Sequence, residues 1–315
     1  MYRIGIDLGG TNIAAGIVDE KYNIIERASV PTEMPAGSEE IVQKIVTLCK
    51  NICDKAGVSI ADIAGIGIGA PGAVNPDTGE VIFACNINMH NTNLAQLVSE
   101  RTGISCKVEN DANAAAYGEY IAGAGRGSRD FVLLTIGTGI GGGIIIGGKL
   151  FSGSNYAGGE IGHMVTHVGG EKCSCGRSGC FERYASASAL VRQARLTICD
   201  KKDSLIMQLC GGDVSKINAK TVCDAADAGD TAAQELLADF ARELAAGLTN
   251  IVNIFQPEII CIGGGMSAQG EKLLAPVREI LYKENYARDI DSQVKLTAAE
   301  LGNDAGIIGA AYIGA

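Results

Sequence analysis

The sequence lacks three features that would point to common classes of protein. It has no basic excess, since 26 Lys and Arg against 36 Asp and Glu give a formal net charge of −10. That charge argues against nucleic acid or an anionic membrane as the main partner. The first residues, MYRIGIDLGG, contain no charged leader with an apolar core, and the most apolar run, GGGIIIGGKL, is too short to span a bilayer. We therefore expect a cytoplasmic protein that binds neither nucleic acid nor membrane.

The composition that remains is that of a folded α/β protein. The 315 residues are 47% apolar and 20% charged, enough for a large core and for two domains. A strand, a glycine turn and a second strand occur twice, at residues 2–19 and 130–150. This repeat of architecture indicates two α/β halves. We place the first domain at residues 1–112 together with about 300–315, and the second at 113–299.

Local patterns place further elements between the hairpins. Apolar positions recur at three or four from Ser38 and stop at Gly57, which predicts a helix. Residues 106–110 read as a short strand, 63–72 as a strand that ends in a glycine turn, and 258–267 as a strand that runs into three glycines and another helix. A helix is expected to begin near Asp111, and a longer one after Asp230.

The first glycine hairpin carries DLGGTN, residues 7–12. Gly9 and Gly10 allow the backbone to approach a phosphate, and Thr11 and Asn12 add hydrogen bonds. Asp7 could hold a hydrated Mg²⁺. For a single hairpin, an ordinary turn beside an aspartate is the better explanation.

Two further glycine clusters favour a phosphate-binding role over an ordinary turn. GTGIGGG spans residues 137–143, and a third cluster, 263–265, follows a strand. Neither matches the P-loop spacing, and no Rossmann fingerprint is present. Two such hairpins and a strand–GGG–helix turn suit a nucleoside triphosphate held between two domains.

Asp111, in ENDANAAAYGEY, follows a short strand and begins a helix. A plain helix cap is one explanation. The other is a general base, because a carboxylate at a strand end of a nucleotide cleft is suited to accept a hydroxyl proton. Asn110 beside it could orient a polyol.

A cluster of cysteines with one histidine forms the pattern H-x9-C-x-C-x4-C. Its members are His163, Cys173, Cys175 and Cys180. Three thiolates and an imidazole are a closed tetrahedral set for Zn²⁺. A disulfide must cope with an odd cysteine count of 11 and a reducing compartment, and it leaves the histidine unexplained. We predict a structural zinc, and we call residues 163–182 the zinc loop.

Glu160 and Glu182 flank the predicted metal ligands. Glu160 lies three residues before His163, so one helical turn would put both on the same side. If one imidazole nitrogen binds zinc, the other can donate to a substrate hydroxyl. Glu182, two residues beyond Cys180, would be directed to the same place.

Taken together, these motifs resemble the ROK family of bacterial sugar kinases over essentially the whole chain, and most closely its glucokinases from Gram-positive bacteria. The motifs are DLGGTN, APG, ENDANAAA, GTGIGGG, GGEIGH, CSCGRSGCFE and IGGG. The resemblance implies the two-domain actin/hexokinase/Hsp70-like (ribonuclease H-like) α/β fold with an interdomain cleft. It also implies transfer of the ATP γ-phosphate to the 6-hydroxyl of glucose, with Mg²⁺ and a structural Zn²⁺ as cofactors.

The resemblance also assigns roles to residues. It implies Asp111 as the catalytic base. The sugar-binding residues would be Asn110, Asp111, Glu160, His163 and Glu182. The nucleotide-binding set would be Asp7, Gly9, Gly10, Thr11, Asn12, Thr138, Gly139 and Gly264. The zinc ligands would be His163, Cys173, Cys175 and Cys180. The family often has a tryptophan near the sugar, and this chain has none, so Asn86 in that segment is a weaker assignment.

Three alternatives remain at this point. The family also contains sugar-sensing repressors, which carry a helix-turn-helix before the first glycine motif, whereas here the first strand starts at Tyr2. A non-catalytic sugar-binding or filament-forming protein is disfavoured by Asp111 beside both hairpins. The substrate could be N-acetylmannosamine, N-acetylglucosamine, fructose or allose, and polyphosphate could replace ATP. A homodimer or homotetramer is expected.

Overall fold

The computed structural model describes residues 1–198 and 204–314, which form two compact units. The first comprises residues 1–133, 143–159 and 300–315, and the second residues 134–142 and 160–299. No helix in the described ranges is long and apolar enough to cross a membrane. The division differs from the sequence-based boundary at residue 112, because the helix that follows this boundary belongs with the first unit.

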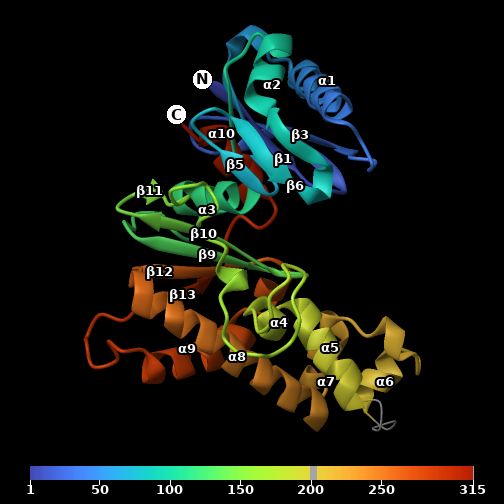
Figure 1. Cartoon of the computed structure of the whole chain (residues 1–315), viewed down its shortest axis with the longest axis vertical. Coiled ribbons are helices and arrows are strands. Elements are labelled where there is room, and N and C mark those ends of the chain that lie inside the picture. The colour runs from blue at the N-terminus through green and yellow to red at the C-terminus, as the bar shows by residue number, and fades with distance from the viewer. Residues whose placement is uncertain (199–203, 315) are drawn as a thin grey trace. The chain divides into compact units, whose positions relative to one another are not determined.

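Three sheets lie in the part of the chain that the structure describes (Figure 1). The first has the order β3-β2-β1-β4-β8, the second β11-β10-β9-β12-β13 and the third β5-β6-β7. The strands are β1 Tyr2–Leu8, β2 Asn12–Val18, β3 Ile24–Pro31, β4 Ile63–Ala70, β5 Ala73–Asn75, β6 Glu80–Ala84, β7 Met89–Asn93, β8 Cys106–Asn110, β9 Phe131–Ile136, β10 Ile140–Ile146, β11 Lys149–Leu150, β12 Ile259–Gly263 and β13 Lys295–Ala298. Both predicted glycine hairpins are confirmed, β1–β2 and β9–β10.

Ten α-helices and five short 3₁₀ helices lie in the described ranges. The α-helices are α1 Ser38–Ala56, α2 Leu94–Thr102, α3 Asp111–Ala122, α4 Glu182–Ala185, α5 Ala187–Ile198, α6 Leu205–Leu209, α7 Ala219–Asp227, α8 Thr231–Phe255, α9 Glu271–Glu284 and α10 Asp304–Tyr312. The 3₁₀ helices are η1 Ile60–Asp62, η2 Cys85–Ile87, η3 Ile161–His163, η4 Val214–Lys216 and η5 Gly265–Gln269. The helices predicted from Ser38, near Asp111 and after Asp230 are confirmed.

In the first unit, helices cover both faces of the β3-β2-β1-β4-β8 sheet. Helices α1 and α2 share one apolar core with these strands, which includes Ile6, Ile45 and Val98. On the other face α10 lies so close that a Cβ on Gly5 would be 1.8 Å from the Ile307 carbonyl oxygen. Small residues therefore bring helix and strand backbones into direct contact, which no larger side chain at Gly5 would permit.

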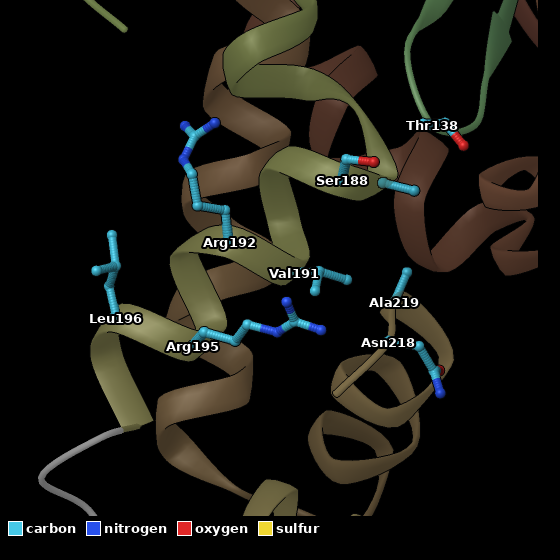
Figure 2. Close-up of a pocket in the computed structure, with 9 residues that line it drawn as sticks. Thr138, Ser188, Val191, Arg192, Arg195, Leu196, Asn218 and Ala219 are labelled. Carbon is cyan, nitrogen blue, oxygen red and sulfur yellow. The ribbon is translucent and has the colours of Figure 1, made fainter. Parts of the chain in front are cut away.

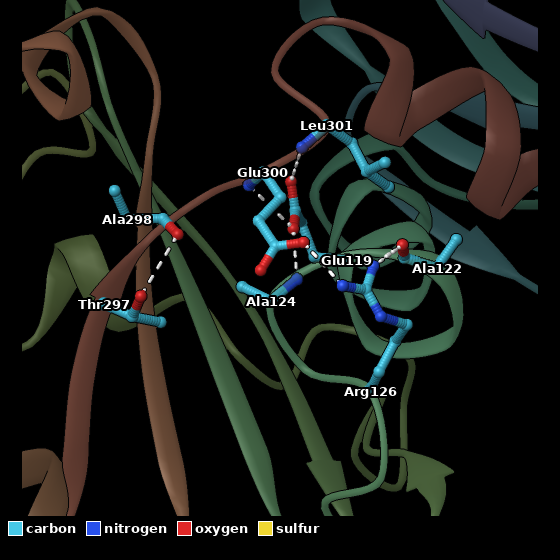
Figure 3. A network of polar contacts seen from close by, with 8 residues as sticks. All are labelled: Glu119, Ala122, Ala124, Arg126, Thr297, Ala298, Glu300 and Leu301. Atoms are coloured by element: carbon cyan, nitrogen blue, oxygen red, sulfur yellow. Dashed lines mark hydrogen bonds and ion pairs between the residues drawn. The ribbon is translucent and has the colours of Figure 1, made fainter.

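A buried carboxylate ties α3 to the segment that leads into α10 (Figure 3). Glu119 is fully buried, and its oxygens accept backbone N–H groups from Leu301 at 2.7 Å, Ala124 at 2.9 Å and Glu300 at 3.2 Å. Three donors offset the cost of burying this charge. This network joins α3 to residues 300 and 301, which also belong to the first unit.

Candidate functional site

The predicted site residues fall into two sets, one in each unit. The first set lies at the carboxyl ends of β1 and β8. There the β1–β2 turn is closed by a hydrogen bond from Gly9 N to Asn12 O at 2.9 Å. The buried Thr32 supports it, since its hydroxyl donates to Gly9 O at 2.7 Å. The Thr11 and Asn12 side chains are exposed at this turn.

Asp7 is at the end of β1 and is only partly exposed. Burial raises the pKa of its carboxyl above the ordinary value of 3.8. No hydrogen bond to this carboxylate is found among the described residues. A divalent cation with its waters would lower that pKa and supply the missing partner, so the residue fits a hydrated Mg²⁺.

At the start of α3 the structure shows which residue caps the helix, a role that the sequence left open for Asp111. Asn110 is the N-cap, and its Oδ1 accepts the backbone N–H groups of Ala112 at 2.9 Å and Asn113 at 3.1 Å. Its Nδ2 donates to Gly72 O at 3.0 Å, which leaves one amide N–H of Asn110 for a ligand. Asp111 is the first helical residue, and its Oδ1 accepts from Ala112 N at 2.8 Å. Capping is therefore chiefly the task of Asn110.

Glu109, which the sequence analysis did not single out, lies immediately before this pair. Its Oε1 accepts from the Asn110 backbone N–H at 2.9 Å and from Asn113 Nδ2 at 3.0 Å. The side chain is buried, and burial raises the pKa of its carboxyl. An acidic residue one position before a polar helix start was the available sequence signal. The consequence is a rigid entry into α3.

The second set includes the turn between β9 and β10, which we call the phosphate turn, residues 137–140. It is closed by Gly137 N donating to Gly139 O at 3.0 Å, and the Thr138 side chain is exposed. Gly264 follows β12 at φ 76°, where a Cβ would lie 2.5 Å from Ile136 O, so only glycine fits there.

A cavity of about 540 Å³ begins at Thr138 and extends between α5 and α7. Figure 2 shows Thr138 at the hairpin tip, Ser188 and Val191 on α5, and Asn218 at the start of α7. The further lining residues are Ala187, Arg192, Arg195, Leu196 and Ala219. The cavity was not predicted from the sequence, where two arginines one helical turn apart, Arg192 and Arg195, are its visible signal.

The four predicted metal ligands come together in the second unit. One ligand atom from each of His163, Cys173, Cys175 and Cys180 lies within 4.8 Å of the others. The sulfurs of Cys175 and Cys180 are 3.6 Å apart. Tetrahedral Zn²⁺ with Zn–S bonds of about 2.3 Å holds sulfurs about 3.8 Å apart. The geometry and the donor chemistry therefore fit zinc.

The zinc loop is shaped by backbone turns that require glycine. Gly176 and Gly179 have φ values of 89° and 84°, and a Cβ on Gly179 would lie 1.6 Å from His167 O. Burial raises the pKa of the Cys173 and Cys180 thiols. Because zinc binds thiolates, metal binding to these residues would release protons.

Glu182 lies between the ligand cluster and the phosphate turn. Its Oε1 is 3.1 Å from Cys173 Sγ and 3.9 Å from His163 Nδ1. The imidazole turns Nδ1 toward the thiols, 3.6 Å from Cys173 Sγ. Glu160 precedes η3, and its carbonyl accepts from His163 N at 3.0 Å, although its side chain is exposed.

Comparison with known proteins defines the family. Residues 3–314 match the ROK family. The chain is 40% identical to a glucokinase of Streptomyces coelicolor, over 98% of this chain and 96% of that one. It is 36% identical to a glucokinase of Halalkalibacterium halodurans, over 99% and 94% of the two chains.

A solved structure extends the likeness to three dimensions. It is a ROK family glucokinase from Streptomyces griseus in complex with glucose and AMPPNP, 39% identical, with a TM-score of 0.84 over 99% of both chains. The chain thus belongs to the ROK family of sugar kinases. Its fold is the actin/hexokinase-like α/β fold, as the resemblance implied.

Proposed function

We propose that this chain is a glucokinase that transfers the γ-phosphoryl group of ATP to the 6-hydroxyl of glucose. The observation that carries the proposal is the likeness over 99% of both chains to a glucokinase solved with glucose and AMPPNP. The glucokinases of two further species, 36% and 40% identical over nearly the whole chain, support it.

Asp111 is the proposed general base. Its carboxylate takes the proton of the 6-hydroxyl as that oxygen bonds to the γ-phosphorus and the bond to the ADP oxygen breaks. The capping of α3 by the neighbouring Asn110 supports this role, because it removes the helix cap as the main reason for an aspartate at this position. Glu109 fixes the backbone from which Asp111 projects.

Residues of both sets are proposed to bind glucose. Asn110 has one amide N–H remaining, and Glu160 and Glu182 offer carboxylate oxygens to hydroxyl groups. His163 with Nδ1 on the metal would present Nε2–H to the sugar. Zinc, when bound by the four ligands, supplies structural cross-linking without an open coordination position.

The nucleotide is proposed to bind both glycine turns. Gly9, Gly10, Thr11 and Asn12 in one unit and Thr138, Gly139 and Gly264 in the other would contact phosphates. Mg²⁺, held through water by Asp7, would neutralise phosphate charge. The cavity beyond Thr138, with Arg192 and Arg195 on its wall, is of a size for the nucleoside.

The decisive experiment measures ADP release by the purified protein with Mg-ATP and each of glucose, fructose, allose, N-acetylglucosamine and N-acetylmannosamine. Glucose is expected to give the highest kcat/KM. A parallel series replaces ATP by polyphosphate and measures the sugar phosphate formed, because this donor yields no ADP. Absence of turnover with every sugar would reject the kinase, whereas preference for an N-acetyl sugar would reject the substrate alone.

A further inference from the structure

The zinc loop and its flanking residues touch the phosphate turn at three points, all within the second unit. Gly162, next to the ligand His163, lies against the turn, where a Cβ would be 2.1 Å from Ile140 O. Ala187 N donates to Gly137 O at 2.9 Å. The third point is Gly139, where a Cβ would be 2.4 Å from Glu182 Oε2.

One carboxylate links these two structures directly. The Oε1 atom of Glu182 is 3.1 Å from the sulfur of the proposed ligand Cys173. Its Oε2 atom occupies the space beside Gly139 that a side chain would need. The direction of Glu182 therefore depends on Cys173 at one end and on the phosphate turn at the other.

From these contacts we propose that the ligand cluster holds the phosphate turn in its nucleotide-binding conformation, so that zinc and nucleotide bind cooperatively. The proposal rests on the function proposed above and extends the role of zinc from the sugar to the nucleotide. Backbone amides bind a phosphate well only when they are already aligned, since aligning a free turn costs conformational entropy. Zinc would meet that cost in advance by fixing Gly162, Glu182 and Ala187.

Thermodynamic linkage makes the proposal measurable without turnover. If zinc tightens nucleotide binding, nucleotide must tighten zinc binding by the same factor. Couplings of this kind are typically about five- to 150-fold. The quantity to measure is therefore the affinity for zinc with and without nucleotide, in the absence of sugar.

The experiment uses the full zinc-loaded chain and a chromogenic chelator that competes for zinc, with and without saturating AMPPNP and excess Mg²⁺. AMPPNP is expected to lower the zinc dissociation constant at least about fivefold. Calorimetry reports separately whether AMPPNP and zinc bind at all. Failure of either to bind would reject the proposed cofactors, whereas binding of both without any change in zinc affinity would reject the coupling alone.

Matched glycine variants test whether the coupling between zinc and nucleotide runs through the contact of Gly162 with the phosphate turn. Gly162→Ala forces the Ile140 carbonyl to move, so AMPPNP should no longer lower the zinc dissociation constant. We call the lowering seen in the wild-type chain the protection of zinc by AMPPNP. Gly37→Ala is the control, because Gly37 belongs to the first unit and a Cβ there meets nothing within 4 Å, so AMPPNP should still tighten zinc binding. Full protection in Gly162→Ala would overturn the route.

Glu182→Ala provides a second variant if Gly162→Ala does not fold. It removes the linking carboxylate but leaves both backbones unchanged, and sugar is absent from the assay. The protection by AMPPNP should fall severalfold relative to the wild-type chain. A Glu182→Ala protein with undiminished protection would contradict the proposal.

Discussion

Adjacent side chains at the start of α3 perform separate tasks. Asn110 caps the helix, Glu109 anchors its first turn, and Asp111 accepts a hydrogen bond from Ala112 N in its own turn. Sequence reasoning identified Asp111 as either cap or base, because both roles favour an aspartate at this position. The distinction depends on rotamers, which the order of residues does not specify.

Asp111→Asn should lower kcat by about 10²–10⁴-fold while glucose still binds, because an amide keeps the shape but cannot take a proton. Isothermal titration with glucose and steady-state kinetics measure the two effects. Asp230→Asn is the matched control, since Asp230 caps α8 through Ala233 N at 2.8 Å and should leave kcat unchanged. A near-normal kcat in Asp111→Asn would exclude it as the base.

Glu109 predicts a pH dependence of stability. Burial raises the pKa of its carboxyl above the ordinary 4.5, so its ionisation costs more in the folded than in the unfolded chain. The free energy of unfolding of the wild type, relative to Glu109→Gln, should therefore fall as pH rises from about 4.5 through the raised pKa. Chemical unfolding at a series of pH values measures this difference.

Asp19 gives the opposite sign and serves as the comparison for Glu109. Hydrogen bonding from the Asn23 side chain holds the pKa of Asp19 below its ordinary value. The wild type should therefore lose stability relative to Asp19→Asn as pH falls through that lowered pKa. A Glu109 difference that does not fall as pH rises, or an Asp19 difference that does not fall as pH falls, would contradict the corresponding assignment.

Among the elements, α10 shows most clearly how small residues set the packing. A Cβ on Gly309 of α10 would lie 1.8 Å from Ala114 O in α3, and one on Gly118 of α3 would lie 2.1 Å from Ala305 O. The two helices therefore meet backbone to backbone. At these glycines the packing leaves no space for an added methyl group.

Gly309→Ala should lower the free energy of unfolding by about 1–3 kcal/mol or more, because α3 and α10 would have to separate. Gly37→Ala is the control. Gly37 is exposed, and a Cβ there meets nothing within 4 Å, so its effect should stay within about 0.5 kcal/mol. Equal unfolding midpoints for the two variants would show that the contact can relax.

The elements that could be predicted are those whose signal is local. Two apolar runs on either side of a glycine turn predicted β1–β2 and β9–β10, and the apolar stripe from Ser38 predicted α1. The three short strands β5–β7 were missed because residues such as His90 and Asn91 carry no strand pattern. Helix α10, DAGIIGAAY, was missed since it is apolar on all sides. Its packing partners lie far away in the sequence.

The candidate site, too, could be predicted only where its residues carry a local sequence pattern. Spacing alone grouped His163 with the three cysteines, and the structure brings all four together. Spacing did not reveal that Glu182 contacts Cys173 or that Gly139 faces its other oxygen. Nor did it reveal the cavity beside Arg192 and Arg195. Such relations arise from tertiary packing of separate segments, for which a single sequence holds no local signal.

For the molecule as a whole, the ligand cluster belongs to one unit alone. Removing zinc with a chelator should therefore raise hydrogen exchange in residues 160–185 and in the phosphate turn. The reason is that the free energy of metal binding stabilises the fold around the site. Strands β1 and β4 of the other unit should keep their protection. Restoring zinc is the control, and equal deprotection of both units would show that the metal supports the entire chain.

The anchoring of Leu301 and Glu300 on Glu119 has a consequence for the order of synthesis. The first unit is assembled from both ends of the described chain, so its sheet lacks α10 until residues 300–314 have been made. At about 5–20 residues per second, translating the intervening segment takes on the order of ten seconds or more. During that interval Gly5 and Gly67 leave a strand surface uncovered, which makes the incomplete chain more prone to aggregate than the finished one.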